Sequence, residues 1–326
     1  MKAQSVALIL ASMLAIVAPA GAIARLTGGE QQVADPDFKP TVAKPAYVKT
    51  HPLIVVDEAH ANFHTVSGRY KPFADLLAAD GYRVIAGTES FTSDRLHDAR
   101  VLVISNARGA GLTAENAADP PSAFSEAECD SVRDWVRAGG SLLLIADHAP
   151  YGATAALLAS RFGVEMGKGY AWSVLKPGAE PTTQIEYTAE AGLLHGHPIT
   201  LGVARVVTFT GQSLSVPPGA VALLTFGSTS YESSAANAPS DMAAFREGKQ
   251  TTARAIGGRA QAIALEYGKG RVVMVGEAAM FSAQVASFPD EKGQTVKFKM
   301  GMNVEGNDNA QFLLNIMHWL TRLARE

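Results

Sequence analysis

The chain has 326 residues, a formal net charge of −3 at pH 7 and a single cysteine, Cys129. This charge gives no attraction for nucleic acid, and one cysteine excludes an intrachain disulfide framework and a lipid anchor on an N-terminal cysteine. Apolar residues make up 47% and charged residues 18% of the chain, a balance that predicts one large globular domain rather than a disordered protein.

The N-terminus is typical of a secretory signal peptide. Met1-Lys2 precede an uncharged stretch from Val6 to Ala18, and small residues follow it. We therefore expect residues 1–22 to be a signal peptide and the mature protein to be periplasmic or secreted. After cleavage we expect no membrane span, and an uncleaved anchor is the alternative.

Residues 23–50 contain several prolines and predict an extended lead-in to a single domain over 51–326. Within that domain, runs of apolar residues predict buried strands at 53–57, 82–86, 101–106, 142–146 and 271–275. Apolar residues at helical spacing predict helices at 68–80, 125–138 and 151–162. Ser125 and Glu128 have the spacing of a capping box. This alternation predicts a doubly wound, mostly parallel α/β sheet of the flavodoxin-like kind.

The pattern changes after residue 162. Residues 163–218 contain short β-like pieces between glycines and prolines, and predict an inserted β-rich segment. Residues 228–258 are polar and weakly patterned, and predict a flexible loop over the site. Residues 309–323 carry one apolar face, which predicts a C-terminal helix.

Ionisable side chains follow three of the predicted strands. Asp57, Glu58, His60 and His64 follow the first, Asp147 and His148 follow the strand at 142–146, and Glu277 follows the strand at 271–275. Because the carboxyl ends of parallel strands meet at one edge of a sheet, we expect these side chains to form one site.

The order of these elements resembles the class I glutamine amidotransferase-like fold, and within it the exported domains related to gliding-motility and intraflagellar-transport proteins. The matching pieces are the strand at 53–57, the helix at 124–140 with the strand after it, the turn and strand at 268–273, and the final helix with His318-Trp319-Leu320. The resemblance implies an amidotransferase-like scaffold over most of the mature chain.

The resemblance does not extend to the nucleophile. Amidotransferases of this group place a cysteine at the strand-to-helix turn that here holds Asp147-His148, whereas Cys129 lies within the preceding predicted helix. We therefore expect that the protein is not a glutamine amidotransferase.

Histidine and carboxylate side chains at strand ends predict a divalent metal, either zinc, manganese or iron. The expected ligands are Asp57, His60, His64, Asp147 and His148. Glu58, as base on a bound water, His148 and Glu277 are the expected catalytic groups. This site predicts a secreted metal-assisted hydrolase with an unknown substrate. A metal-free alternative uses His148 as base, oriented by Asp147 or Asp57.

A second group of polar residues, Asn303, Glu305 and Asn307, precedes the final helix and predicts contacts with substrate. Capping of that helix by Asp308 or Asn309 is the structural alternative here. Polar residues at strand ends also satisfy loop backbone groups without any catalytic role. The alternative function is therefore a non-catalytic periplasmic binding or interaction module for a carbohydrate, peptide or protein.

Overall fold

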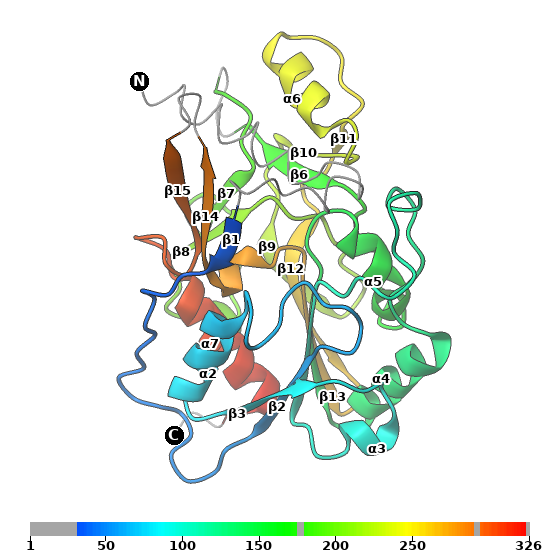
Figure 1. The fold of residues 1–326 in the computed structure, drawn as a ribbon, viewed down its shortest axis with the longest axis vertical. Helices are drawn as coiled ribbons and strands as arrows, with labels where there is room; N and C mark the ends of the chain where they lie inside the picture. The colour runs from blue at the N-terminus through cyan, green and yellow to red at the C-terminus, as the bar shows by residue number, and fades with distance from the viewer. Residues whose placement is uncertain (1–30, 175–178, 290–293, 324–326) are drawn as a thin grey trace.

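The computed structural model describes residues 31–174, 179–289 and 294–323 (Figure 1). The predicted signal peptide lies outside the described residues. Within those three ranges, no helix is both long enough and apolar enough to cross a bilayer.

The protein is a mixed α/β structure built on a seven-stranded sheet. In spatial order the strands are β3 (Arg83–Gly87), β2 (Leu53–Asp57), β4 (Val101–Ser105), β5 (Ser141–Ile145), β13 (Gly270–Val275), β12 (Ala260–Tyr267) and β9 (Ala220–Thr225). Neighbouring strands from β3 to β13 are parallel, whereas β12 pairs antiparallel with both β13 and β9. The five predicted apolar runs all form strands of this sheet.

Helices and buried cores lie on both faces of the sheet (Figure 1). On β5, Leu143 and Ile145 face one core, while Leu142 and Leu144 face the other, because side chains alternate along a strand. The first core is closed by α2 (Lys71–Ala79) and α7 (Asn309–Thr321). The second is closed by α3 (Ser93–Leu96), α4 (Glu126–Ala138) and α5 (Tyr151–Ser160).

Helix α4 begins as its sequence predicts. The hydroxyl of Ser125 accepts from the Glu128 backbone N–H, and the Glu128 carboxylate accepts from the Ser125 N–H. This is a capping box, which satisfies two backbone donors that would otherwise lack partners.

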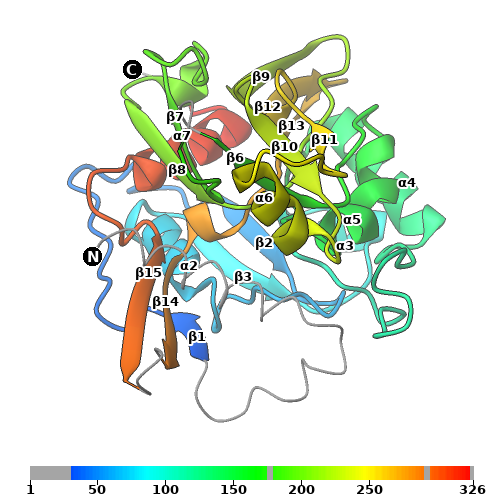
Figure 2. The ribbon, with the colours of Figure 1, turned by 90° about the horizontal axis from the view of Figure 1, so that it is seen from above.

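Three smaller sheets complete the described part of the fold. They are formed by β1 (Gln31–Ala34), β14 (Ala283–Pro289) and β15 (Thr295–Gly301); by β6 (Tyr170–Ser173), β10 (Ser230–Ser233) and β11 (Arg254–Ala255); and by β7 (Gln184–Thr188) and β8 (Arg205–Phe209). The described residues also form two short 3₁₀ helices, η2 (Pro198–Thr200) and η3 (Ala279–Phe281). In Figure 2 the β14–β15 hairpin extends to one side, and α6 (Ala238–Arg246) lies beside β10.

The predicted β-rich insertion at 163–218 does contain β6, β7 and β8. The segment 228–258 differs from the single loop that its composition predicts, because it contains β10, α6 and β11. Its order comes from aromatic packing across the sequence. The ring of Trp172 stacks on Tyr231 at 4.7 Å between centroids and meets the edge of Phe245 at 5.5 Å. The periodicity of apolar residues within the segment cannot predict these long-range contacts.

Candidate functional site

Nine side chains gather at the carboxyl ends of the parallel strands, and we call them the strand-end cluster. They are linked by ring contacts, hydrogen bonds and electrostatic interactions. The members are Phe63, His64, Arg69, Arg108, Asp147, His148, Tyr151, Tyr170 and Glu277. The cluster therefore joins the ends of β2, β4, β5 and β13, as the strand pattern predicts.

Two arginines form the cationic part of the cluster. Their guanidinium carbons lie over the ring of Phe63, at 4.0 Å from its centroid for Arg69 and 4.7 Å for Arg108. Arg108 also donates a long hydrogen bond of 3.4 Å to the Tyr151 hydroxyl. Among the described residues neither arginine forms an ion pair with a carboxylate, and the buried Nε of Arg69 has no hydrogen-bond partner. Burial, and to a smaller extent the charge of Arg108, lowers the pKa of Arg69.

His64 is buried within the cluster. Its Nδ1 lies 3.0 Å from the Ser105 hydroxyl, and its ring stacks on Tyr70 at 4.3 Å. Burial lowers the pKa of His64 well below its usual 6.5, and the charges of Arg69 and Arg108 lower it further. His64 is therefore a neutral imidazole at physiological pH.

Two buried carboxyl groups follow β5 and β13, which are adjacent in the sheet. Burial raises the pKa of Asp147, although an electrostatic interaction with His148 and hydrogen bonds from the His148 backbone N–H and the Asn106 side chain oppose this shift. Burial also raises the pKa of Glu277 well above its usual value, and the charge of Asp147 raises it further. The Glu277 carboxyl group accepts from the backbone N–H groups of Ala279 and Met280 at 2.6 and 2.9 Å. These two N–H groups lower the pKa of Glu277, but burial and the charge of Asp147 outweigh them and favour the protonated form. The same hydrogen bonds anchor η3.

One ring nitrogen of His148 is hydrogen-bonded, and the other makes no hydrogen bond to any described residue. Its Nδ1 lies 2.8 Å from the carbonyl oxygen of Ala149, and a carbonyl only accepts, so Nδ1 carries the proton. The lone pair of the neutral ring is then on Nε2, to which no described residue bonds. The ring stacks on Tyr170 at 4.2 Å between centroids. The free Nε2 suits the predicted role of His148 as a general base. The prediction that Asp147 or Asp57 orients this ring is wrong, because Nδ1 donates to the Ala149 carbonyl oxygen and Asp57 bonds His60 instead.

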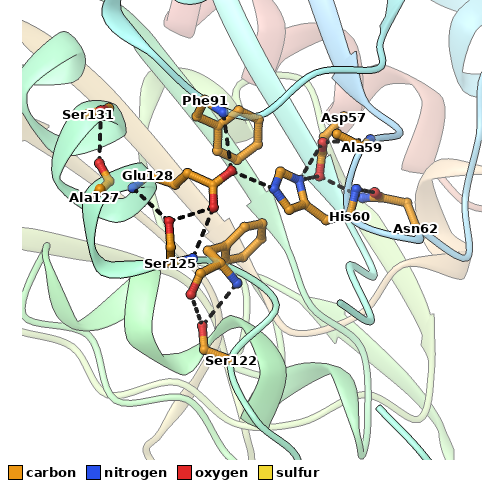
Figure 3. Close-up of polar contacts among 11 residues, drawn as sticks. Asp57, Ala59, His60, Asn62, Phe91, Ser122, Ser125, Ala127, Glu128 and Ser131 are labelled. Carbon is orange, nitrogen blue, oxygen red and sulfur yellow. Dashed lines mark hydrogen bonds and ion pairs between the residues drawn. The ribbon is translucent and has the colours of Figure 1, made fainter. Parts of the chain in front are cut away.

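His60 lies apart from this arrangement, between two carboxylates (Figure 3). Its Nδ1 is 2.8 Å from Asp57 Oδ1, and its Nε2 is 2.9 Å from Glu128 Oε1. The rings of Phe91 and Phe124 lie against it at 4.6 and 4.8 Å. Both ring nitrogens are therefore occupied, and His60 ties the loop after β2 to the first turn of α4.

The electrostatics of this bridge favour a protonated His60. Burial lowers the pKa of His60, but the hydrogen bonds and charges of Asp57 and Glu128 outweigh burial and raise it above 6.5. Burial acts to raise the pKa of Glu128, but hydrogen bonds from Ser125 and His60 lower it to about 2. We call Asp57, His60 and Glu128 the His60 bridge.

The His60 bridge predicts a characteristic pH dependence of stability. Because the folded pKa of Glu128 is below its usual 4.5, its contribution is present above pH 4.5 and is lost as the pH falls towards 2. Because the folded pKa of His60 is raised, its contribution is present below pH 6.5 and is lost as the pH rises through the raised value. Both contributions are complete between pH 4.5 and pH 6.5. We therefore expect the loss of stability in Glu128→Gln, measured by urea unfolding, to be largest in this pH range. Glu126→Gln, at an exposed position on the same helix, is the control. A pH-independent difference would contradict this assignment.

The predicted metal ligands are divided between these two arrangements. Among the residues that the structure describes, no group of three or more His, Cys, Asp or Glu side chains is placed to hold a metal ion. The His60–His64 spacing predicts a shared helical face, but the first helix after β2 begins only at Lys71. Glu58 accepts from the Val66 backbone N–H at 2.7 Å, which stabilises the loop. The geometry gives the metal site no support, and the metal remains a prediction.

The predicted substrate contacts at Asn303, Glu305 and Asn307 lie away from the strand-end cluster. Asn303 and Glu305 line a separate cavity of about 300 Å³ together with Asp35 and Lys299. Asn307 donates to the carbonyl oxygens of Gly301 and Val304 and orders the turn before α7. Asp308 occupies the N-cap position, but its carboxylate accepts from Ala204 and Arg205 rather than from its own helix.

A close approach of backbone segments positions Tyr170 against His148. A Cβ on Gly152 of α5 would lie 2.1 Å from the carbonyl oxygen of Gly167. Gly152→Ala therefore has to displace the loop that carries Tyr170, and we expect a loss of about 1–3 kcal/mol in the free energy of unfolding. Gly196→Ala is the control, since nothing lies within 4 Å of its Cβ position. Equal stability of the two variants in urea unfolding would contradict the close approach.

Sequence analysis missed Arg69, Arg108 and Glu128. Arg108 follows β4 closely, so inspection of the strand ends for cations as well as acids would have found it. Arg69 lies far beyond the end of β2 and just before α2, so no strand-end signal points to it. Glu128 was assigned only to the capping box, and no sequence signal links it to His60.

Comparison with known proteins gives fold similarity only. No family model matches the chain, and no curated protein matches it. Among solved structures, the N-terminal domain of mmIFT52 is similar with a TM-score of 0.54 at 15% identity, covering 82% of this chain and 97% of that domain. This likeness supports the resemblance to intraflagellar-transport domains at the level of the fold.

Two weaker structural neighbours are similar over comparable lengths. A ThuA-like protein from Bacteroides uniformis has a TM-score of 0.40 at 11% identity, covering 86% of this chain and 93% of that one. A GMP synthase component from Thermoplasma acidophilum has a TM-score of 0.41 at 9% identity, covering 84% of this chain and 96% of that one. At these values neither contributes to a functional argument.

Proposed function

We propose that the protein is an exported binding protein whose strand-end cluster holds a small ligand with an anionic group, either a carboxylate or a phosphate. The observation that carries this proposal is the pair Arg69 and Arg108, which lie over one ring without a carboxylate partner among the described residues. Partly buried guanidinium groups are costly when unpaired, and an anion would supply the missing charge and hydrogen bonds. Export rests on the sequence of residues 1–22.

We also infer that the scaffold is doubly wound and amidotransferase-like. The order of strands and the helices on both faces of a mostly parallel sheet support this inference. In such sheets ligands bind outside the carboxyl ends of the strands, which is where the arginines lie.

Calorimetric titration of the mature protein tests the proposed binding. Inorganic phosphate and succinate serve as anionic probes, and glucose serves as the neutral comparison. We expect saturable binding of at least one anion and a loss of about 10–100-fold in affinity in Arg108→Ala, the range for one charge-assisted contact. Arg95→Ala, which removes an exposed, ion-paired arginine, should bind like the wild type. Equal affinity in Arg108→Ala would refute the proposal.

A second candidate function, hydrolysis without a metal, is favoured by the free Nε2 of His148. In this hypothesis Nε2 takes the proton of an attacking water, and Asp147 stabilises the resulting imidazolium. We expect turnover of p-nitrophenyl acetate or p-nitrophenyl phosphate to persist in EDTA and to fall about 10²–10⁴-fold in His148→Gln. Turnover that depends on added zinc, manganese or iron would instead support the metal-assisted hydrolase predicted from the sequence.

A further inference from the structure

A second cavity, which we call the β10 pocket, lies between the Gly167–Gly169 loop and the end of β10. It has a volume of about 420 Å³ and is lined by polar side chains that include Lys168, Glu232, Ser234 and Arg254. This volume is within the range of pockets that bind small molecules. None of its lining residues belongs to the strand-end cluster.

The floor of the β10 pocket is held by the buried carboxylate of Glu232. This group accepts from the Ser213 backbone N–H and hydroxyl at 3.0 and 2.7 Å, and from the Lys168 backbone N–H at 3.1 Å. A Cβ on Gly167 would lie 2.5 Å from Glu232 Oε2, and one on Gly169 would lie 2.4 Å from the Ser233 carbonyl oxygen. Glycine at both positions therefore allows the loop to approach β10 closely.

Two cations at the rim have only weak partners. The Nζ of Lys168 is 3.9 Å from the exposed carboxylate of Asp119, and Arg254 Nη1 is 3.8 Å from the exposed carboxylate of Glu165. Arg254 Nη2 also donates to the Ser213 hydroxyl at 3.2 Å and lies 3.4 Å from the buried carboxylate of Glu232. The long, solvated pairs with Asp119 and Glu165 contribute little, so Lys168 and the Nη1 end of Arg254 are available to an incoming acid group.

Hydroxyl groups and a carboxylate complete the lining. The hydroxyl of Ser233, a buried residue in the wall of the pocket, accepts from the Trp172 indole N–H at 2.9 Å, and Ser234 is exposed beside it. The exposed Ser234 hydroxyl can donate and accept hydrogen bonds, while the exposed Glu165 carboxylate accepts, which suits the hydroxyl groups of a polyol.

We propose that the β10 pocket binds a sugar acid or a sugar phosphate, with the acidic group on Lys168 and Arg254 and the ring hydroxyls on Ser234 and Glu165. This site is separate from the proposed anion site, and its residues can be varied without touching Arg69 or Arg108.

The indole N–H of Trp172 reports on the pocket because it donates to Ser233. The protein has three tryptophans, so a ¹⁵N-correlated NMR spectrum resolves few indole signals, and Trp172→Phe assigns this one. Glucuronate and glucose 6-phosphate are the probes. Glucose, which has the ring hydroxyls but no acid group, and inorganic phosphate, which has an acid group but no ring hydroxyls, are the controls. We expect a saturable shift of the Trp172 signal with glucuronate or glucose 6-phosphate, and a smaller response to glucose or phosphate alone. The probe that binds more tightly identifies the acid group.

Variants decide whether the response comes from this pocket. Lys168→Ala should weaken binding about tenfold, equivalent to the loss of one ionic contact with the ligand. Lys71→Ala is the matched control, since Lys71 on α2 has a similar exposed fraction, 57% against 60% for Lys168. Arg108→Ala should leave the Trp172 response intact even if it abolishes anion binding in the strand-end cluster. Absence of a saturable shift, or a shift that persists unchanged in Lys168→Ala, would overturn the proposal.

Discussion

Replacing His60 by alanine is expected to lower the free energy of unfolding by about 3–5 kcal/mol, the usual cost of removing one partner from a buried ion pair. The substitution leaves the carboxylate of Asp57, which is fully buried, without its cationic neighbour. It also empties the space between Phe91 and Phe124 and releases the loop after β2 from α4. Urea unfolding of the wild type and the variant at pH 6 measures the difference.

A matched control separates burial from simple ion pairing. His97 also lies 2.9 Å from a carboxylate, that of Asp98, but both side chains are exposed. His97→Ala should change stability by no more than about 0.5 kcal/mol, as expected for an exposed pair. If His60→Ala were no less stable than His97→Ala, the His60 bridge would not be a structural element.

The same experiment bears on the predicted metal. A stabilising metal at His60 would make the unfolding of the wild type sensitive to EDTA, since a ligand that binds only the folded state stabilises it by mass action. The His60 bridge requires no such sensitivity. Elemental analysis of wild type and His60→Ala, purified without chelators, gives the stoichiometry directly.

The strand ends were predictable because buried parallel strands are continuous apolar runs, and the polar residues that follow such runs must gather at one edge. That logic placed Asp147, His148 and Glu277 together. It failed for His60, whose partner Glu128 is 68 residues away and carries a complete local explanation as a capping residue. When a local motif already accounts for a residue, the sequence gives no reason to expect a second, long-range contact.

The order of the segment 228–258 was hidden for a related reason. Its few large residues, Tyr231 and Phe245, lack helical or strand periodicity, yet both pack on Trp172 from another part of the chain. The composition of the segment suggested a loop because the large apolar side chain on which it packs, Trp172, lies outside the segment. Folding of such segments depends on tertiary contacts rather than on local propensity.

Replacing Arg69 by methionine is expected to abolish most anion binding in the strand-end cluster while making the ligand-free protein more stable. Arg69 buries an Nε without a partner and lies close to the like charge of Arg108, so its charge opposes folding when no anion is bound. Methionine retains much of the packing of the side chain on Phe63 without that cost. We expect a gain of about 1 kcal/mol in the free energy of unfolding and a loss of about 10–100-fold in affinity.

These opposite signs distinguish a binding residue from a structural one. An arginine retained for packing or for an unnoticed hydrogen bond would lose stability on replacement and would leave the anion titration unchanged. Arg69→Lys retains the positive charge but not the planar arrangement of donors. It should therefore be less stable than Arg69→Met and bind the anion more tightly than Arg69→Met but more weakly than the wild type. If Arg69→Met is destabilised and still binds phosphate or succinate as the wild type does, the pair of arginines is part of the scaffold and the ligand site lies elsewhere.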